Sequence, residues 1–365
     1  MIRVATLLIL GWASAATFAN APVPGSLIDV GGYRLHIACE GYGTPSVVFD
    51  VGLGGSALEW RAVVDKVREF TRVCTYDRAG YGWSDVGPLP RTSSVIVNEL
   101  YLLLESADID RPFLLVGHSY GGYNMQLFAR RYPFLVAGMV LVDSSHPAQV
   151  ERFMAPPIGL VTMPSTRWGV VKFGDPPKPH RNLSAEAKRL VSNQMKRWRT
   201  RRTLSHEFLG FRDSASELRS AQALPVMPMV VISRGKRVWP PGRRGNLLEK
   251  LWIKLQSELA DQSPYSAHIV ARNSGHHVHL DQPQLVAYSI AVITDIHRVQ
   301  HASDIGAERQ DTTARETMDF RAAAWLRDSL VMHVGNGIHV ASVSQRSHQL
   351  RGDTVTVGYP RDGAP

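Results

Sequence analysis

A serine between glycines lies where a short apolar run gives way to a helical pattern. Gly117-His118-Ser119-Tyr120-Gly121 follows the predicted buried strand that begins at residue 112, and the stretch 123–133 after it is typical of a helix that ends at a proline. A nucleophilic serine at such a turn adopts a strained backbone conformation, and small neighbours let strand and helix approach closely. The pattern therefore predicts Ser119 as a nucleophile rather than as a solvated serine in a flexible glycine turn.

A serine hydroxyl is a weak nucleophile by itself and needs a general base. Residues 273–283, NSGHHVHLDQP, supply three histidines, and His276 directly follows a glycine in the loop between the last predicted strand and the last predicted helix. Loops at the carboxyl ends of parallel strands share one rim of the sheet, so Ser119 and His276 should lie close together. We predict His276 as the base, with His277 and His279 as its competitors.

The base in turn needs a carboxylate that orients its ring. The usual place would be the loop after the predicted strand around 229–232, but that loop contains no acid before Glu249. Asp143 stands one strand earlier, at a predicted carboxyl end, and gives the chain order Ser, Asp, His. We predict Asp143 as the orienting acid, and Asp261 and Glu258 are the alternatives.

Acyl transfer also needs two N–H groups that bind the oxyanion of the tetrahedral intermediate. One should be the backbone N–H of Tyr120, which directly follows the nucleophile. The other should come from the glycine-rich turn VGLGGS that follows the apolar run VVFD, where Leu53 is the best placed residue. The predicted oxyanion-binding residues are therefore Leu53 and Tyr120.

The elements that position these residues alternate between strands and helices. The strands read as continuous apolar runs, which indicates an α/β fold with a mostly parallel sheet covered by helices on both faces. The alternation stops over 147–223, which is rich in Pro and Arg, is mostly helical in pattern and shows no strand. The predicted organisation is: 1–19, a signal peptide or N-terminal anchor; 20–146 and 224–300, the two parts of one core domain; 147–223, a helical cap insertion; 301–365, a tail of unknown structure.

The N-terminal segment predicts export. Arg3 precedes a short apolar run, and Ala13-Ser14-Ala15 offers a small-x-small cleavage site. The apolar run is shorter than the roughly 20 residues of a membrane span, so we expect a periplasmic or secreted protein, with an uncleaved N-terminal anchor as the alternative. The formal net charge of +9 comes largely from basic runs at 188–202 and 233–245, which we interpret mainly as a solvated surface.

Neither a cofactor nor a nucleic-acid partner is expected. The chain has two cysteines and no Cys/His spacing that is typical of a zinc site. The basic runs are not accompanied by a nucleic-acid-binding motif. The expected partner is a small-molecule acyl substrate, and a peripheral membrane contact through the basic runs is a weaker hypothesis.

Taken in order, the motifs DVGLGG, YDRAGYGWSD, VGHSYGG, ARRYP, LVDSSHP and SGHHVHLDQP resemble those of the α/β-hydrolase superfamily over residues 26–300. The resemblance implies a mostly parallel eight-stranded sheet whose second strand is antiparallel, with a helical cap after the sixth strand. It departs from the family pattern at Val51, where members often have a histidine, and after the seventh strand, where the acid is missing. It also makes the strands of Cys39 and Cys74 neighbours, so a disulfide between them is a hypothesis if the protein is exported.

The resemblance favours a serine hydrolase of the esterase or lipase type that forms an acyl-enzyme on Ser119. A serine nucleophile argues against epoxide hydrolase and haloalkane dehalogenase chemistry, which uses a carboxylate at this position. An acyltransferase, a hydrolase of carbon–carbon bonds beside a carbonyl, and a ligand-binding protein without turnover are the alternatives on the same fold. Fold alone does not identify the acyl group or the leaving group.

Overall fold

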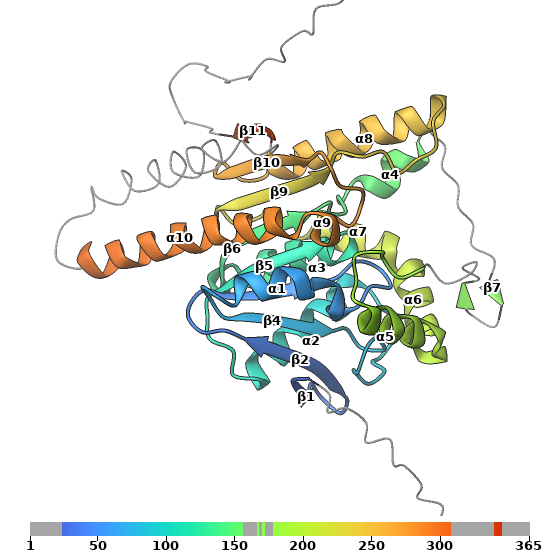
Figure 1. Ribbon diagram of the computed structural model, residues 1–365, viewed down its shortest axis with the longest axis horizontal. Helices are drawn as coiled ribbons and strands as arrows, with labels where there is room; N and C mark the ends of the chain where they lie inside the picture. The colour runs from blue at the N-terminus through green and yellow to red at the C-terminus, as the bar shows by residue number, and fades with distance from the viewer. Residues whose placement is uncertain (1–23, 156–165, 168–169, 172–177, 308–338, 345–365) are drawn as a thin grey trace, which may run out of the picture.

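The computed structural model describes residues 24–155, 166–167, 170–171, 178–307 and 339–344. Within these residues, one twisted sheet of nine strands forms the centre of the molecule, in the order β1-β2-β4-β3-β5-β6-β9-β10-β11 (Figure 1). The strands are β1 (Ser26–Asp29), β2 (Arg34–Glu40), β3 (Ser46–Asp50), β4 (Val73–Asp77), β5 (Phe113–His118), β6 (Val136–Val142), β9 (Met229–Arg234), β10 (Ser266–Ala271) and β11 (His339–Ser344).

The first eight of these strands form the predicted sheet. The central strands pair in parallel, and β2 runs antiparallel to both of its neighbours, as the resemblance implied. The edge strand β11 is an addition, because it comes from the tail at 301–365, for which the sequence predicted no defined structure. It pairs antiparallel with β10.

Two hydrophobic cores cover the two faces of the sheet. In β5, Leu114 and Val116 belong to one core and Phe113 and Leu115 to the other, which explains why the strand is apolar without alternation. The first core lies under α1 (Arg61–Val67) and α10 (Pro283–Ala307), which Figure 1 shows side by side over the sheet. The second lies under α2 (Ser93–Ser106), α3 (Tyr120–Arg131) and the end of α8 (Arg243–Ala260).

Between β6 and β9 the chain forms mainly helices. They are α4 (Gln149–Met154), α5 (Ala185–Lys196), α6 (Trp198–Leu209) and α7 (Phe211–Ser220). The expectation that this stretch contains no strand is wrong, since β7 (Thr166–Arg167) and β8 (Val170–Val171) pair as a small antiparallel sheet. Strands of two residues are too short to leave a periodic signal in the sequence.

Two arginines of the basic run at 188–202 make hydrogen bonds to another part of the chain. Arg199 donates hydrogen bonds to the carbonyl oxygens of Gly82 and Ser84, and Arg197 donates another to Gly82. These bonds attach the start of α6 to the loop that follows β4. Arg199 is half-buried, so the interpretation of the run as a solvated surface does not hold for it, whereas Arg197 stays exposed despite its hydrogen bond.

A disulfide joins Cys39 on β2 to Cys74 on β4, which are directly paired across the two strands. In the described part of the chain, no helix is long and apolar enough to cross a bilayer. The predicted signal peptide or anchor at 1–19, and most of the tail at 301–365, lie outside the described residues. The part of the tail that is described continues α10 as far as Ala307 and forms β11.

Candidate active site

Ser119 occupies a sharp turn between β5 and α3. Its backbone angles are φ 51° and ψ −117°, a conformation that L-residues rarely adopt. The neighbouring glycines are required by close approach: a Cβ on Gly121 would lie 2.5 Å from the carbonyl oxygen of Asp50, and one on Gly122 would overlap the Ser144 hydroxyl. The glycines of the motif thus let α3 begin directly against β3 and the loop after β6.

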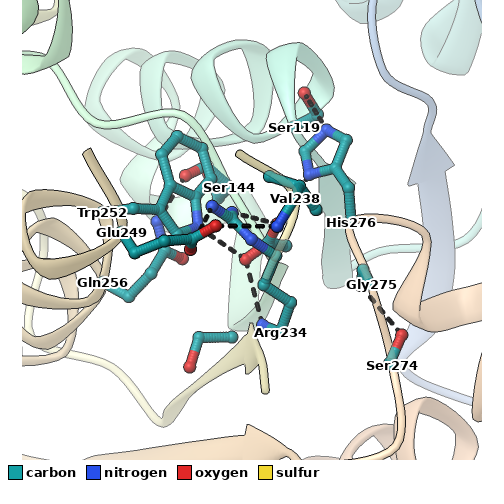
Figure 2. Close-up of polar contacts among 12 residues, drawn as sticks. Ser119, Ser144, Arg234, Val238, Glu249, Trp252, Gln256, Ser274, Gly275 and His276 are labelled. Carbon is teal, nitrogen blue, oxygen red and sulfur yellow. Dashed lines mark hydrogen bonds and ion pairs between the residues drawn. The ribbon is translucent and has the colours of Figure 1, made fainter. Parts of the chain in front are cut away.

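A continuous chain of hydrogen bonds links three of the predicted residues. The Ser119 Oγ lies 3.0 Å from His276 Nε2, and His276 Nδ1 lies 2.6 Å from Asp143 Oδ2. Figure 2 shows the His276 ring beside Ser119, with the side chains of Arg234, Trp252 and Glu249 further along the same network. Because an ionised carboxylate only accepts hydrogen bonds, His276 carries its proton on Nδ1 and offers the lone pair of Nε2 to the serine.

Asp143 is completely buried and is surrounded by donors. Its Oδ1 accepts hydrogen bonds from the backbone N–H of Arg234 at 3.0 Å and from Trp252 Nε1 at 2.7 Å. Arg234 Nη1 lies 2.9 Å from Oδ2, the oxygen that also binds His276. Burial by itself would raise the pKa of Asp143, but the hydrogen bond to His276, with the charges of His276 and Arg234 and the Trp252 bond, outweighs it and holds this pKa below its usual value.

The loop that carries His276 is held by hydrogen bonds of its own. Asp281 Oδ2 accepts the backbone N–H of Gly275 at 3.1 Å and the hydroxyl of Ser274 at 3.2 Å. The Ser274 hydroxyl also lies 2.9 Å from the carbonyl oxygen of Gly275 (Figure 2). These contacts fix the position from which the His276 ring reaches Ser119.

The competing residues of the sequence analysis lie elsewhere. The buried His279 faces Glu59, with 3.5 Å between Nε2 and Oε2, and burial with the neighbouring His276 and His279 lowers the pKa of His277 to about 4. Glu258 pairs with Arg152. Asp261 lies at the exposed end of α8. In the described part of the chain, none of these residues is hydrogen-bonded to Ser119, and of the three candidate acids only Asp143 binds His276.

The turn that carries Leu53 packs directly against the serine. A Cβ on Gly52 would lie 3.2 Å from Ser119 Cβ. Among the residues that the structure describes, neither the Leu53 nor the Tyr120 backbone N–H has a hydrogen-bond partner, which leaves both donors available to a bound oxygen. A Cβ on Gly54 would lie 3.2 Å from the Leu204 side chain, so α6 covers this turn.

An arginine that the sequence analysis did not single out braces the same turn. Arg78, at the carboxyl end of β4, donates hydrogen bonds to the carbonyl oxygens of Val51 at 2.7 Å and Gly52 at 3.0 Å. It also pairs with Asp50 at 2.6 Å and with Glu207 of α6 at 2.9 Å, and the three charged side chains are fully buried. Arg78 therefore stabilises the turn, although Val51 stands where related proteins often have a histidine. The only sign of this role in the sequence was an arginine directly after a predicted strand.

A second unexpected residue is His118, which precedes the serine. Its Nε2 donates a hydrogen bond to the carbonyl oxygen of His276 at 2.9 Å, and its ring packs against the rings of His276, His277 and His279. Burial, and then the neighbouring histidines, keep the pKa of His118 well below its usual value. His118 is thus neutral and supports the His276 loop through this hydrogen bond.

Within the described residues, no group of three or more potential ligands is arranged to hold a metal ion.

The amino-acid sequence is similar to that of a known family and to those of individual proteins. A sequence model described as the alpha/beta hydrolase family matches residues 47–287. The uncharacterized protein YqjL of Bacillus subtilis is 29% identical over 247 residues, which is 67% of this chain and 81% of that protein. Further curated relatives are matched over smaller parts of their own length, 18% and 39% in two cases.

Solved structures share the fold. Cfl2 from Burkholderia cenocepacia superimposes with a TM-score of 0.55 at 22% identity, over 73% of this chain and 94% of that chain. A thermophilic esterase from Thermogutta terrifontis superimposes with a TM-score of 0.51 at 19% identity, over 74% of this chain and 97% of that chain. At such identities the likeness establishes the architecture and leaves the chemistry to the site itself.

Proposed function

The chain belongs to the alpha/beta hydrolase family, and on this premise we propose that it is a serine hydrolase that cleaves a carboxylic ester or a related acyl bond. The observation that carries the proposal is the unbroken path from Ser119 Oγ through His276 to the buried Asp143, with contacts of 3.0 and 2.6 Å. Nucleophile, base and orienting acid in hydrogen-bond contact are what acyl transfer by a serine requires.

In the first half of the reaction, Ser119 Oγ attacks the substrate carbonyl carbon while His276 Nε2 takes the hydroxyl proton. Asp143 stabilises the imidazolium that forms and keeps its ring in place. Collapse of the tetrahedral intermediate breaks the bond to the leaving group, to which His276 returns the proton. Water then attacks the acyl-enzyme with His276 as base, which releases the acid and restores Ser119.

The negative charge of each tetrahedral intermediate would be bound by the backbone N–H groups of Leu53 and Tyr120. Their positions beside Ser119 and the lack of other partners in the described chain support this role. We also propose that the helices between β6 and β9 act as a cap over the site. The contact of Leu204 with the turn at Gly54, and the pairing of Glu207 with Arg78, support this assignment.

The test is hydrolysis of a short-chain and a long-chain p-nitrophenyl ester by the purified protein and by Ser119→Ala. We expect a loss of about 10⁴-fold or more in kcat/KM in the variant, because nucleophile and base act as one unit. The exposed Ser216 provides a matched control, and Ser216→Ala should keep full activity. The preference between the two esters measures the size of the acyl site.

A fluorophosphonate probe, which reacts with activated serines, separates the remaining outcomes. Labelling of Ser119 in the absence of ester hydrolysis would indicate a narrower substrate and would keep the serine-hydrolase proposal. Absence of both labelling and hydrolysis in a folded protein would reject it and leave the ligand-binding alternative.

We further propose that the protein is exported. The N-terminal pattern motivates this proposal, and the disulfide between Cys39 and Cys74 supports it, since such bonds persist mainly in oxidising compartments. A thiol count on the unreduced, denatured protein should find no free thiol. Recovery of two free thiols from the cytosolic fraction, with an intact N-terminus, would contradict the proposal.

A further inference from the structure

The position where the acid was expected and not found is occupied by an arginine that contacts the acid from the neighbouring strand. Arg234 is the last residue of β9. Its backbone N–H binds Asp143 Oδ1, and its Nη1 lies 2.9 Å from Asp143 Oδ2. That same Oδ2 lies 2.6 Å from His276 Nδ1. One carboxylate oxygen is therefore shared between the imidazole and a guanidinium.

Two indole rings and a second carboxylate also contact the guanidinium. It packs against Trp239 and Trp252, with 4.6 and 4.7 Å between its central carbon and their ring centroids. Its Nη2 lies 3.2 Å from Glu249 Oε2, and Arg234 is only 4% exposed. Glu249 Oε1 in turn accepts the backbone N–H group of Val238 at 2.7 Å (Figure 2) and that of Trp239 at 2.9 Å, so the carboxylate that pairs with the arginine is also fixed.

The charges along this path alternate in sign from Glu249 through Arg234 to Asp143. The positive charge of Arg234, next to the Asp143 oxygen that binds His276, disfavours the protonated imidazole. The negative charge of Glu249, on the other side of Arg234, offsets that effect. Burial strengthens both influences, because little water is present to screen them. Trp252 donates a hydrogen bond to Asp143 and packs against the guanidinium of Arg234. The network can therefore both fix the position of Asp143 and change how strongly its charge acts on His276.

We propose that Arg234 and Glu249 are positioning residues that set how strongly Asp143 supports the protonated form of His276, Arg234 weakening this support and Glu249 restoring it. The inference rests on the proposed function of Ser119, His276 and Asp143. Neither residue reaches the reacting atoms, so both act through Asp143. A purely structural role would require only a well-packed side chain at each position, not a particular charge.

The other titratable groups around His276 do not account for the shifts that we expect in the variants below. They come from the end of β5, from the His276 loop with α9 (Val278–Asp281), from the 3-10 helix η1 (Ala57–Trp60) and from the segment before α5. These groups are His118, His277, His279, Glu59 and His180. The pKa values of His118, His277 and His279 lie below the usual value, mainly through burial, so these rings are neutral near pH 7. All five are unchanged in the variants proposed below.

The test compares Arg234→Met with Glu249→Gln. The readout is the midpoint of the acid limb of the kcat/KM profile against pH. Loss of the positive charge should move this midpoint up by about one pH unit, as for a charge within about 4–6 Å of the partner of a titrating group. Loss of the negative charge should move it down by a smaller amount, because Glu249 pairs with Arg234 and so lies one residue further from Asp143. The midpoint of the double variant should lie between those of the two single variants.

Two further variants separate charge from packing. Arg237→Met removes an exposed arginine of the same loop that pairs only with Asn246 in the described chain, and it should leave the midpoint unchanged. Arg234→Lys keeps the charge and should keep the midpoint even where kcat falls. Should Arg234→Met fail to fold, the proposal is tested by Glu249→Gln, in which the midpoint should move down. Glutamine keeps the shape of the glutamate side chain, so this variant should fold.

The same midpoint can be read without any activity. In protein labelled with ¹³C at histidine, the His276 signal is assigned by its loss in His276→Gln, and its pH titration is followed in the four single variants and the double variant. Opposite shifts in Arg234→Met and Glu249→Gln support the proposal even if the protein shows neither ester hydrolysis nor labelling of Ser119, a result that would count against the proposed function alone. Shifts of the same sign, or no shift in a folded Glu249→Gln protein, would overturn it.

Discussion

Replacement of Arg78 by methionine should be among the most destabilising single substitutions in the core. The guanidinium lies between Asp50 and Glu207, and all three side chains are fully buried. Methionine keeps much of the length of the side chain and removes its charge and its donors. Two buried carboxylates would then face one another without a cation, and the carbonyl oxygen of Val51 would lose its donor.

The size of the effect follows from these contacts. Removal of one partner from a buried ion pair costs about 3–5 kcal/mol, and a buried carbonyl without a donor adds about 1–3 kcal/mol. Asp50 keeps the amide of Asn124 at 2.6 Å, and Glu207 keeps the hydroxyl of Tyr81 at 2.8 Å, which limits the total. We therefore expect a loss of about 5 kcal/mol in the free energy of unfolding, or about 7 °C in Tm for a protein of this size.

Urea unfolding followed by tryptophan fluorescence measures this loss. Arg72→Met is the matched control, because Arg72 pairs with Asp110 at an exposed site, where an ion pair is worth about 0–1 kcal/mol. Adding Glu207→Gln to Arg78→Met should recover at least about 1 kcal/mol, since it removes one of the two uncompensated charges. A loss below about 1 kcal/mol in Arg78→Met, or a double variant less stable than the single one, would refute the reasoning.

Three further outcomes are expected. Asp143→Asn should lower kcat by about 10⁴-fold with the fold intact by circular dichroism, because the amide no longer selects the Nδ1–H form of the imidazole; a loss below about tenfold would exclude Asp143 as the orienting acid. Cys39→Ala/Cys74→Ala should lose about 4 kcal/mol of stability in urea, as expected for a crosslink with a sequence separation of 35, and a reductant should destabilise only the parent protein. Burial lowers the pKa of His268 to about 4 in the folded protein, whereas the unfolded chain binds a proton near 6.5, so this residue makes stability fall as the pH drops from about 6.5 to about 4. Urea titrations over this range should show a slope smaller by up to about 1.4 kcal/mol per pH unit in His268→Gln, and an unchanged slope would show that His268 is not kept neutral by burial.

The residues with a local signature could be located from the sequence. Ser119 stands in a glycine frame between a strand and a helix, and His276 follows a glycine after the last predicted strand. Asp143 could be placed by elimination, since the next strand ended without an acid. The structure brings these three side chains into hydrogen-bond contact because their loops share one rim of the parallel sheet.

The partners of those residues could not be found in the same way. Glu207 meets Arg78 across 129 positions of the chain, and Arg234 meets Asp143 across 91. No periodic or local pattern marks such pairs, because each charged residue alone reads as a surface side chain. Only the packing of α6 on the turn after β3, and of β9 beside β6, shows that these charges are buried and paired.

The strand β11 has a consequence for how the protein can be shortened. It covers the outer edge of β10, and it comes from well beyond residue 287, where the family match ends. A chain cut soon after α10 would keep the whole site and would expose the backbone N–H and C=O groups of β10 along an open edge. Such an edge is a template for pairing with another molecule. A truncated enzyme would thus keep its chemistry while gaining a tendency to self-associate that the full chain suppresses with its own tail.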